Sequence, residues 1–440
     1  MLLKYIVQNY KSIGHKIEFN MFPTQNNIDK RYLANIRTKA GTWEVLRRGA
    51  LFGANASGKS SFIESIDFAR SFIVNGIKSG RRIDLNRFRA EFDDLDGSSL
   101  FQFQIYINAN VYEYGFSLYP QRVFEEWLMV LTSKGFEPIF QRRTNDDFVT
   151  DIEITPLLGK SNYKDRRIAD VLKEGMKENQ RNQLFLYKLA DNGVKKAEAV
   201  MRWFEKLQVI FPHSKFHMLE KKLKNSRLAD FLGEKLKSYD TGVDKIFSTF
   251  KKVNINEMLN EMDVPKKIIE DIEETESGLV EINGKIFIFD GEKGETVFYE
   301  LQLEHTLNSN KFNFNKEDES DGTKRLLDLL PILFNLENKD SVYFVDEIDR
   351  SLHTKITKNF VKSFAEHAAD SMNQMIFTTH DVNLINLEEM RQDEIWFVDK
   401  SKEGETSIRP FSDFELSDGY DAIRAYIAGR FGAVPTIRNL

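Results

Sequence analysis

The chain has 440 residues, 41% of them hydrophobic and 30% charged, which is typical of folded domains and excludes a disordered chain. It contains no cysteine, which excludes disulfide bonds and zinc sites built on cysteine. The net charge of −6 does not favour a nucleic-acid binder, and no apolar run approaches the ~20 residues that cross a bilayer, so we expect a soluble, cytoplasmic protein.

The first predicted elements are a strand at Leu2–Val7 and a second strand at Val45–Phe52, which is interrupted by Arg47 and Arg48. A glycine-rich turn follows the second strand. Ser60–Val74 then has apolar residues at helical spacing, so a strand, a glycine loop and a helix follow in that order.

The glycine-rich turn fits the phosphate-loop pattern G-x-x-x-x-G-K-[ST]. Glycines let the backbone curl so that N–H groups point at phosphate oxygens, and the following helix adds its positive N-terminal end. Lys59 is expected to reach the β- and γ-phosphates, and the Ser60 hydroxyl to ligate Mg²⁺. The predicted nucleotide-binding residues are Gly53, Asn55, Ala56, Ser57, Gly58, Lys59, Ser60 and Ser61.

The middle of the chain changes character. Phe101–Ile107 and Tyr112–Leu118 alternate apolar and polar residues, which predicts an antiparallel hairpin. Lys, Glu and Leu then dominate, which favours a compact, mostly helical insertion at 161–276 between an N-terminal lobe at 1–160 and a C-terminal lobe at 277–440. Helices are predicted around Ala169–Asn179, Lys195–Leu207, Lys215–Ser238 and Ile255–Glu274.

The C-terminal lobe begins with a predicted meander and continues as alternating strands and helices. This alternation indicates an α/β fold with a largely parallel sheet. The predicted strands are Leu279–Ile282, Lys285–Phe289, Val297–Leu303, Val342–Val345, Met375–Thr378 and Glu394–Val398, and the predicted helices begin near Thr323 and cover Lys355–Ala369.

Polar residues that could bind a metal ion or take part in catalysis follow these strands. Asp346 and Glu347 end an apolar strand, where Asp346 can hold magnesium and Glu347 can polarise an attacking water as a general base. The alternative is a solvated loop with two unpaired carboxylates, and the phosphate loop argues against it. His380 ends the strand that follows, and the remaining histidines show no metal-ligand spacing.

Ser320 precedes a leucine-rich helix and can cap it, which leaves N–H groups suited to a phosphate. The alternative is a plain helix cap without a ligand.

This motif set resembles ABC-type ATPases of the SMC and RecF class. It is more closely similar to the bacterial abortive-infection ATPases, relatives of the ATPase part of the overcoming-lysogenization-defect nucleases. The resemblance rests on Gln8–Ser12, the phosphate loop, Ser320–Leu327, Asp346–His353 and the tail Ala425–Pro435.

The resemblance implies roles for further residues. His380 would contact the γ-phosphate and the attacking water, and Asp349 would be the D-loop residue. Ser320, Gly322 and Thr323 would form a signature loop that acts on the nucleotide of a second copy of the chain. Gln121 is a candidate for the Q-loop glutamine that helps to hold Mg²⁺. Asp321 precedes Gly322 where many signature loops have glycine, and its carboxylate near a γ-phosphate favours slow hydrolysis.

The resemblance also implies the partners. ATP and Mg²⁺ would bind at the interface of a homodimer or higher homo-oligomer. The chain would be the sensor or regulatory subunit of an anti-phage defence system, with a phage protein as trigger and a separate effector, typically a nuclease with a TOPRIM fold. Two alternatives stay open: a DNA-repair or chromosome-maintenance ATPase of the RecF and SMC class, and the ATPase subunit of a transporter.

Overall fold

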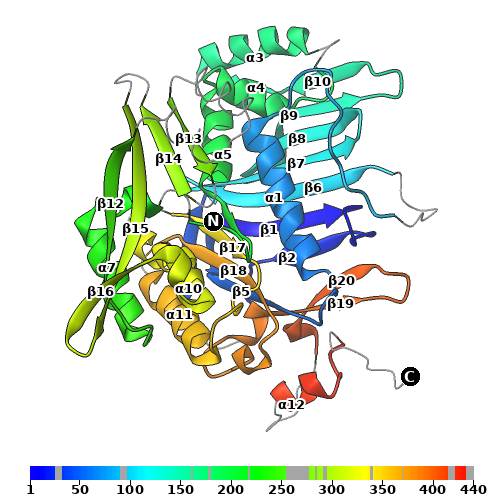
Figure 1. Ribbon diagram of the computed structural model, residues 1–440. Helices are drawn as coiled ribbons and strands as arrows, with labels where there is room; N and C mark the ends of the chain where they lie inside the picture. Colours follow the sequence, from blue (N-terminus) through cyan, green and yellow to red (C-terminus); the bar gives the residue numbers. More distant parts are fainter. Residues whose placement is uncertain are drawn as a thin grey trace. The chain divides into compact units, whose positions relative to one another are not determined.

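The computed structural model divides the chain into two compact units, each of which has its own core (Figure 1). The first contains Met1–His213, Leu336–Asp349 and His353–Leu440, and the second contains Ser214–Asn335 and Arg350–Leu352. The structure describes residues 1–24, 32–89, 97–159, 162–176, 180–216, 219–253, 277–282, 285–290, 295–336, 340–369, 371–414 and 422–432.

A seven-stranded antiparallel sheet forms one layer of the first unit, in the order β10-β9-β8-β7-β6-β1-β2. The predicted hairpin is its centre, because β6 and β7 are joined by a two-residue turn in which Asn108 and Ala109 both have positive φ. The strands are β1 (Leu2–Gln8), β2 (Ile17–Asn20), β6 (Ser99–Ile107), β7 (Asn110–Tyr119), β8 (Arg122–Thr132), β9 (Gly135–Thr144) and β10 (Thr150–Ile154).

A six-stranded sheet forms the other layer, in the order β11-β17-β18-β5-β19-β20. All neighbours in it are parallel except β19 and β20, which confirms the predicted α/β fold class. The strands are β5 (Arg48–Phe52), β11 (Gln208–Ile210), β17 (Val342–Val345), β18 (Gln374–Thr379), β19 (Ile395–Lys400) and β20 (Thr406–Pro410).

The helix α1 (Lys59–Asn75) follows the phosphate loop and lies across the antiparallel sheet (Figure 1). Its buried Phe62 packs against Tyr5 of β1 and Phe19 of β2, with ring centroids 5.6 and 5.5 Å apart. Phe19 also packs against Trp396 of β19 at 4.7 Å. Aromatic packing of this kind joins both sheets and the helix into one core.

The strand predicted at Val45–Phe52 is two strands. β4 (Gly41–Leu46) pairs with β3 (Leu33–Thr38), and β5 then enters the parallel sheet. The change of direction occurs at two buried arginines. Arg47 donates to the carbonyls of Ala369 and Ser371, and Arg48 makes a bidentate ion pair of 2.9–3.0 Å with buried Glu394. Residues that break the apolar pattern of a strand thus hydrogen-bond to partners that are distant in the sequence.

Two regions differ from the predicted helical insertion at 161–276. Its first helices, together with β11, belong to the first unit. These helices are α3 (Tyr163–Gly175), α4 (Phe185–Asp191) and α5 (Lys195–Lys206), preceded by α2 (Pro156–Gly159). The helix predicted at Lys215–Ser238 is also interrupted, because the Asn225 side chain accepts from Arg227 N at 3.1 Å and starts a new helix.

The second unit combines a sheet with helices. β12 (Val243–Val253) pairs along its length with β15 (Glu295–Leu307), from His305 to Thr296, although no strand was predicted at β12. The predicted meander is confirmed by β13 (Ser277–Ile282), β14 (Lys285–Asp290) and β15. The other elements are α6 (Leu219–Lys222), α7 (Ser226–Ser238), β16 (Asn310–Asn315) and α10 (Asp321–Asn335). The helix predicted at Ile255–Glu274 lies outside the described residues.

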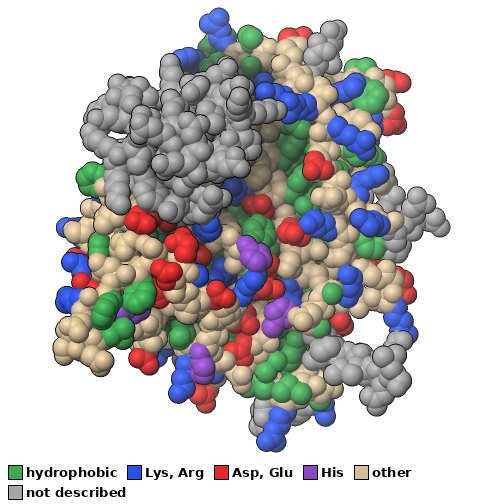
Figure 2. Space-filling view, viewed as in Figure 1, with side chains coloured by type: hydrophobic (Ala, Val, Ile, Leu, Met, Phe, Trp, Pro, Cys, Tyr) green, Lys and Arg blue, Asp and Glu red, His purple; other side chains and the backbone are tan. Residues whose placement is uncertain are grey.

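The first unit ends with α11 (Thr354–His367) and α12 (Ala422–Ile427). In the described part of the chain, every helix is too short or too polar to cross a bilayer. On the face in Figure 2, the acidic and basic side chains of the described residues are interspersed.

Candidate functional site

The predicted site residues of the first unit meet at the carboxyl edge of the parallel sheet. The phosphate loop follows β5, the acid pair follows β17, and His380 follows β18. These strands are neighbours in the order β17-β18-β5 and are parallel, so their carboxyl ends lie side by side. Ligands of open parallel sheets bind at this edge.

The backbone of the phosphate loop is curled before α1 begins. Ala56 has φ 63° and Gly58 has φ 108°, and Gly58 is the residue that precedes the helix. Asn55, Ala56 and Ser60 are exposed, whereas Ser57 is buried. A loop of this shape in front of a helix N-terminus presents backbone N–H groups to an anion.

Lys59 is buried at the centre of the edge. Its Nζ donates to the carbonyls of Gly53 and Ala54 at 2.7 and 3.0 Å, and His380 Nδ1 is 3.4 Å away. Burial lowers the pKa of Lys59 to about 8, while the charges of Asp346, Glu347 and Asp349 oppose that shift. A phosphate bound here would raise the pKa of Lys59 again and stabilise its charged form.

One buried hydroxyl orients the acid pair. Thr378 Oγ1 donates to Asp346 Oδ1 at 2.6 Å and accepts from Glu347 N at 2.8 Å. Glu347 has φ 47°, a region that side chains rarely adopt, and this hydrogen bond holds it there. No role for Thr378 was predicted, and it lies two residues before His380 in the buried strand β18.

His380 lies between the lysine and the acids. Its Nε2 is 3.8 Å from Glu347 Oε1, and both side chains are 34% exposed, so water reaches them. The backbone N of His380 donates to Asp349 Oδ2 at 3.3 Å. Asp349 Oδ1 is buried and has no hydrogen-bond partner among the described residues. The edge thus joins Lys59, Asp346, Glu347, Asp349 and His380.

The donors at this edge fit Mg²⁺. The Ser60 hydroxyl and the Asp346 carboxylate are hard oxygen ligands, and three carboxylates surround a single lysine, a balance that a divalent cation would offset. Among the described residues no group of three or more His, Asp or Glu side chains could hold a metal alone. Mg²⁺ in such sites is held largely by phosphates and water, and when bound it neutralises charge on the β- and γ-phosphates.

The predicted signature residues lie in the second unit, at the start of α10. Ser320 Oγ accepts from Thr323 N at 3.1 Å and lies 2.9 Å from Thr323 Oγ1, which makes Ser320 the cap of the helix. A Cβ on Gly322 would lie 2.9 Å from the Ser351 carbonyl oxygen, so this position is restricted to glycine. Ser320 and Asp321 are exposed.

Gln121 lies elsewhere, in the exposed turn between β7 and β8. No hydrogen bond found in the structure joins it to the phosphate-loop edge, so its assignment to the Q-loop stays a prediction. The loop that follows β11 begins closer to the acid pair than Gln121 does, because the Ile210 carbonyl oxygen accepts from Asp346 N at 2.8 Å. Residues 211–213 therefore leave the sheet beside the acid pair.

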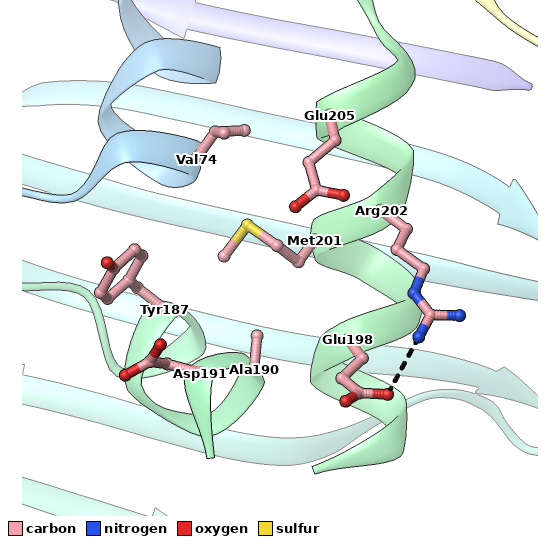
Figure 3. A pocket seen from close by; sticks show the side chains of 8 residues that line it. All are labelled: Val74, Tyr187, Ala190, Asp191, Glu198, Met201, Arg202 and Glu205. Carbon is pink, nitrogen blue, oxygen red and sulfur yellow. Dashed lines mark hydrogen bonds and ion pairs between the residues drawn. The ribbon is translucent and has the colours of Figure 1, made fainter. Parts of the chain in front are cut away.

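A hollow of about 330 Å³ lies at the other end of α1 (Figure 3). Val74 of α1, Tyr187 of α4 and Met201 of α5 line it together with a Glu198–Arg202 ion pair of 3.4 Å. Val74 is in the last turn of α1, on the order of 20 Å from the phosphate loop at its start. The hollow is therefore separate from the phosphate-loop edge.

Three solved structures are similar to this chain. The first is an SMC head domain from Thermotoga maritima, with 13% identity over 94% of this chain and 99% of that chain and a TM-score of 0.38. The second is an Smc head bound to the C-terminal winged-helix domain of ScpA, with 12% identity over 95% of this chain and 98% of that chain and a TM-score of 0.43. The third is an Smc head with an extended coiled coil bound to the C-terminal domain of ScpA derived from Pyrococcus furiosus, with 14% identity over 98% of this chain and 99% of that chain and a TM-score of 0.37. No curated protein matches the chain.

A family model matches residues 50–386, a range that contains the phosphate loop, the signature residues, the acid pair and His380. Its description reads "AAA domain, putative AbiEii toxin, Type IV TA system". The match covers well over half of the chain and confirms the predicted resemblance to abortive-infection ATPases. With a phosphate loop, an acid pair and a histidine at one edge of a parallel sheet, the chain belongs to this AAA-domain family of P-loop ATPases.

Proposed function

We propose that the chain binds ATP with Mg²⁺ at the phosphate-loop edge and hydrolyses it slowly. The observation that carries this proposal is the position of Lys59, which bonds to the loop carbonyls and lies 3.4 Å from His380. A buried lysine with a lowered pKa beside three carboxylates is costly to keep unless a ligand uses it. A nucleoside triphosphate with Mg²⁺ supplies both the anion for the lysine and the cation for the acids.

The residues then take distinct roles. Lys59 holds the β- and γ-phosphates, while Ser60 and Asp346 hold Mg²⁺. Glu347 accepts a proton from the attacking water, and His380 orients that water against the γ-phosphate. The Thr378 hydroxyl fixes the positions of Asp346 and Glu347 relative to each other, because it hydrogen-bonds to both. This division assigns binding to the phosphate loop and chemistry to the strand ends.

The signature residues act in a second copy of the chain. Ser320 is exposed at the start of α10, Gly322 is half-buried and Thr323 is buried behind them, and the N–H groups of such a helix start suit a γ-phosphate. Asp321 stands in the first turn of that helix, and its negative charge disfavours a bound phosphate, which accounts for slow turnover. Asp349 serves as the D-loop residue across the same interface. Two copies would thus share two sites.

At the level of the cell, the chain serves as the ATP-dependent sensor or regulatory subunit of an anti-phage system. The family description, which refers to a toxin of a type IV toxin–antitoxin system, supports a role in defence. The damaging reaction would come from a separate effector, most simply a nuclease of the TOPRIM type, and a phage protein would be the trigger. ATP would control how tightly the two proteins hold each other.

The test is mass photometry of the Glu347→Gln protein with ATP and Mg²⁺. Slow hydrolysis leaves ATP in place in this variant, so particles of twice 51.3 kDa should accumulate with ATP and disappear without it. The Lys59→Ala, Glu347→Gln double variant is the matched control and should stay at 51.3 kDa. Particles whose mass is independent of ATP in both proteins would contradict ATP-driven pairing.

A further inference from the structure

The β19–β20 hairpin contacts the phosphate loop at both of its glycines. A Cβ built on Gly53 would lie 2.4 Å from the carbonyl oxygen of Val398 in β19. One built on Gly58 would lie 1.9 Å from Oγ1 of Thr406, the first residue of β20. Gly58 also has φ 108°, where a side chain is strained. The hairpin thus requires the same two glycines as the phosphate-binding motif.

Thr406 forms the centre of a hydrogen-bond relay. Its Oγ1 donates to the Ser57 carbonyl at 2.9 Å and lies 2.8 Å from Ser12 Oγ. A carbonyl can only accept, so the single proton of Thr406 is committed to Ser57, and Ser12 must be the donor to Thr406. Thr406 is 2% exposed, and hydrogen bonds in series strengthen one another in such surroundings.

The outer end of the relay is anchored to the rest of the unit. Thr406 N donates to the Ser12 carbonyl at 2.7 Å, so the two residues are paired through both main chain and side chain. Beside Ser12, Lys11 makes an ion pair of 2.7 Å with Glu64 of α1. The relay therefore connects the loop to two segments that are remote from it in the sequence.

We propose that Thr406, supported by Ser12, is a positioning residue that holds the phosphate loop in its phosphate-binding conformation. The peptide bond is planar and trans, so the carbonyl of Ser57 and the N–H of Gly58 point in opposite directions. Fixing the carbonyl on the hairpin turns the Gly58 N–H away from the hairpin and keeps it available to an anion. This inference rests on the proposed function, because it assumes that the loop binds nucleotide phosphates.

The experiment compares nucleotide binding by calorimetry and steady-state hydrolysis in variants of the full chain. Thr406→Val removes the relay but keeps the branched shape. The Kd for ATP and for ADP should both rise about five- to tenfold, the effect of one buried hydrogen bond, while kcat at saturating ATP stays within about twofold. Thr406→Ser keeps the hydroxyl and should restore both Kd values. Ser407→Ala, the exposed neighbour on the same strand, is the matched control.

The outcomes separate the two proposals. If the wild-type chain binds ATP no better than Lys59→Ala, the proposed function fails. If the wild type binds ATP and Thr406→Val binds it equally well, the positioning role is overturned while the function stands. A Thr406→Ser protein as weak as Thr406→Val would also overturn it, because packing would then be the cause. Should Thr406→Val fail to fold, Ser12→Ala replaces it, and unchanged ATP and ADP affinity in that variant refutes the relay.

Discussion

The phosphate-loop edge of the first unit and the start of α10 in the second unit are both suited to phosphate, but their polar groups are satisfied in different ways. At the edge, Lys59 and Asp346 are buried and hydrogen-bonded within the site. At the helix start, Ser320 and Asp321 are exposed, and Ser320 bonds to Thr323 of its own first turn.

This difference teaches which half of the proposed site is ready before any ligand arrives. Buried groups held by neighbours cost no reorganisation when a charged ligand binds. An exposed helix start is accessible to a partner and contributes when another molecule is brought against it. Changes at the edge should therefore alter nucleotide binding even in a single chain, whereas changes at Ser320 should act through pairing.

Lys59→Ala gives the largest expected effect. The variant loses a charged donor to two phosphates, so ATP affinity should fall by at least about 100-fold. Calorimetric titration with ATP and Mg²⁺ measures this loss. Lys355→Ala, at an exposed position of α11, should bind as the wild type does. Tight ATP binding by the Lys59 variant would show that the edge is not the nucleotide site.

Glu347→Gln separates binding from chemistry at the same edge. Loss of the general base should lower kcat by about 100-fold or more, with ATP affinity retained. Steady-state release of phosphate at saturating ATP measures kcat, and calorimetry measures binding. Glu403→Gln, in the exposed β19–β20 turn, controls for the loss of one negative charge. Turnover at the wild-type rate would remove Glu347 from the role of base.

Thr378→Val tests whether the edge is organised in advance. The change removes one buried hydrogen bond from Asp346 Oδ1 and one from Glu347 N, which costs about 1–3 kcal/mol of folding stability and lowers Tm by about 2–4 °C per kcal/mol. We expect kcat to fall about tenfold because the acids lose their alignment. Thr378→Ser should restore both properties. Equal kcat in all three proteins would mean that Thr378 supports the fold alone.

Raising the pH tests the state of Lys59. Its pKa is lowered to about 8 in the free protein, and bound phosphates raise it. Below pH 8 the lysine is charged in both states, so ATP affinity should be constant. Above pH 8 binding must take up a proton, so Kd should rise by up to about tenfold per pH unit. Titrations in two buffers of different ionisation enthalpy detect the proton uptake, and a flat Kd from pH 7 to 9.5 would contradict it.

Local patterns were enough to predict the parts of the site that follow one strand at a time. Gly53–Ser60, Asp346–Glu347 and His380 each stand at the end of a short apolar strand, and the parallel sheet brings those ends together. Thr378 and Thr406 could not be assigned in the same way. Their roles depend on hydrogen bonds to Asp346 and to residues 12 and 57, and only the folded chain reveals these pairs.

The fold could likewise be predicted where local patterns determine it, and not where distant contacts do. The alternation of strands and helices predicted the parallel sheet, whereas β8, β9 and β10 were not predicted. They extend the predicted hairpin, because β8 pairs with β7, β9 with β8 and β10 with β9. Buried Glu126 of β8 accepts from the N–H groups of Phe185 and Leu186 and holds the start of α4 against this sheet. A charged residue in a strand reads as exposed from the sequence, so this contact was hidden.

The most direct test of the central claim is a mixing experiment with Lys59→Ala and Ser320→Ala chains. Each variant alone should be inactive, because every dimer it forms lacks either the lysine or the serine at both sites. A mixed dimer has one intact site, so an equal mixture should recover about a quarter of the wild-type hydrolysis rate per chain. A mixture as inactive as its components would contradict a site shared between two copies of the chain.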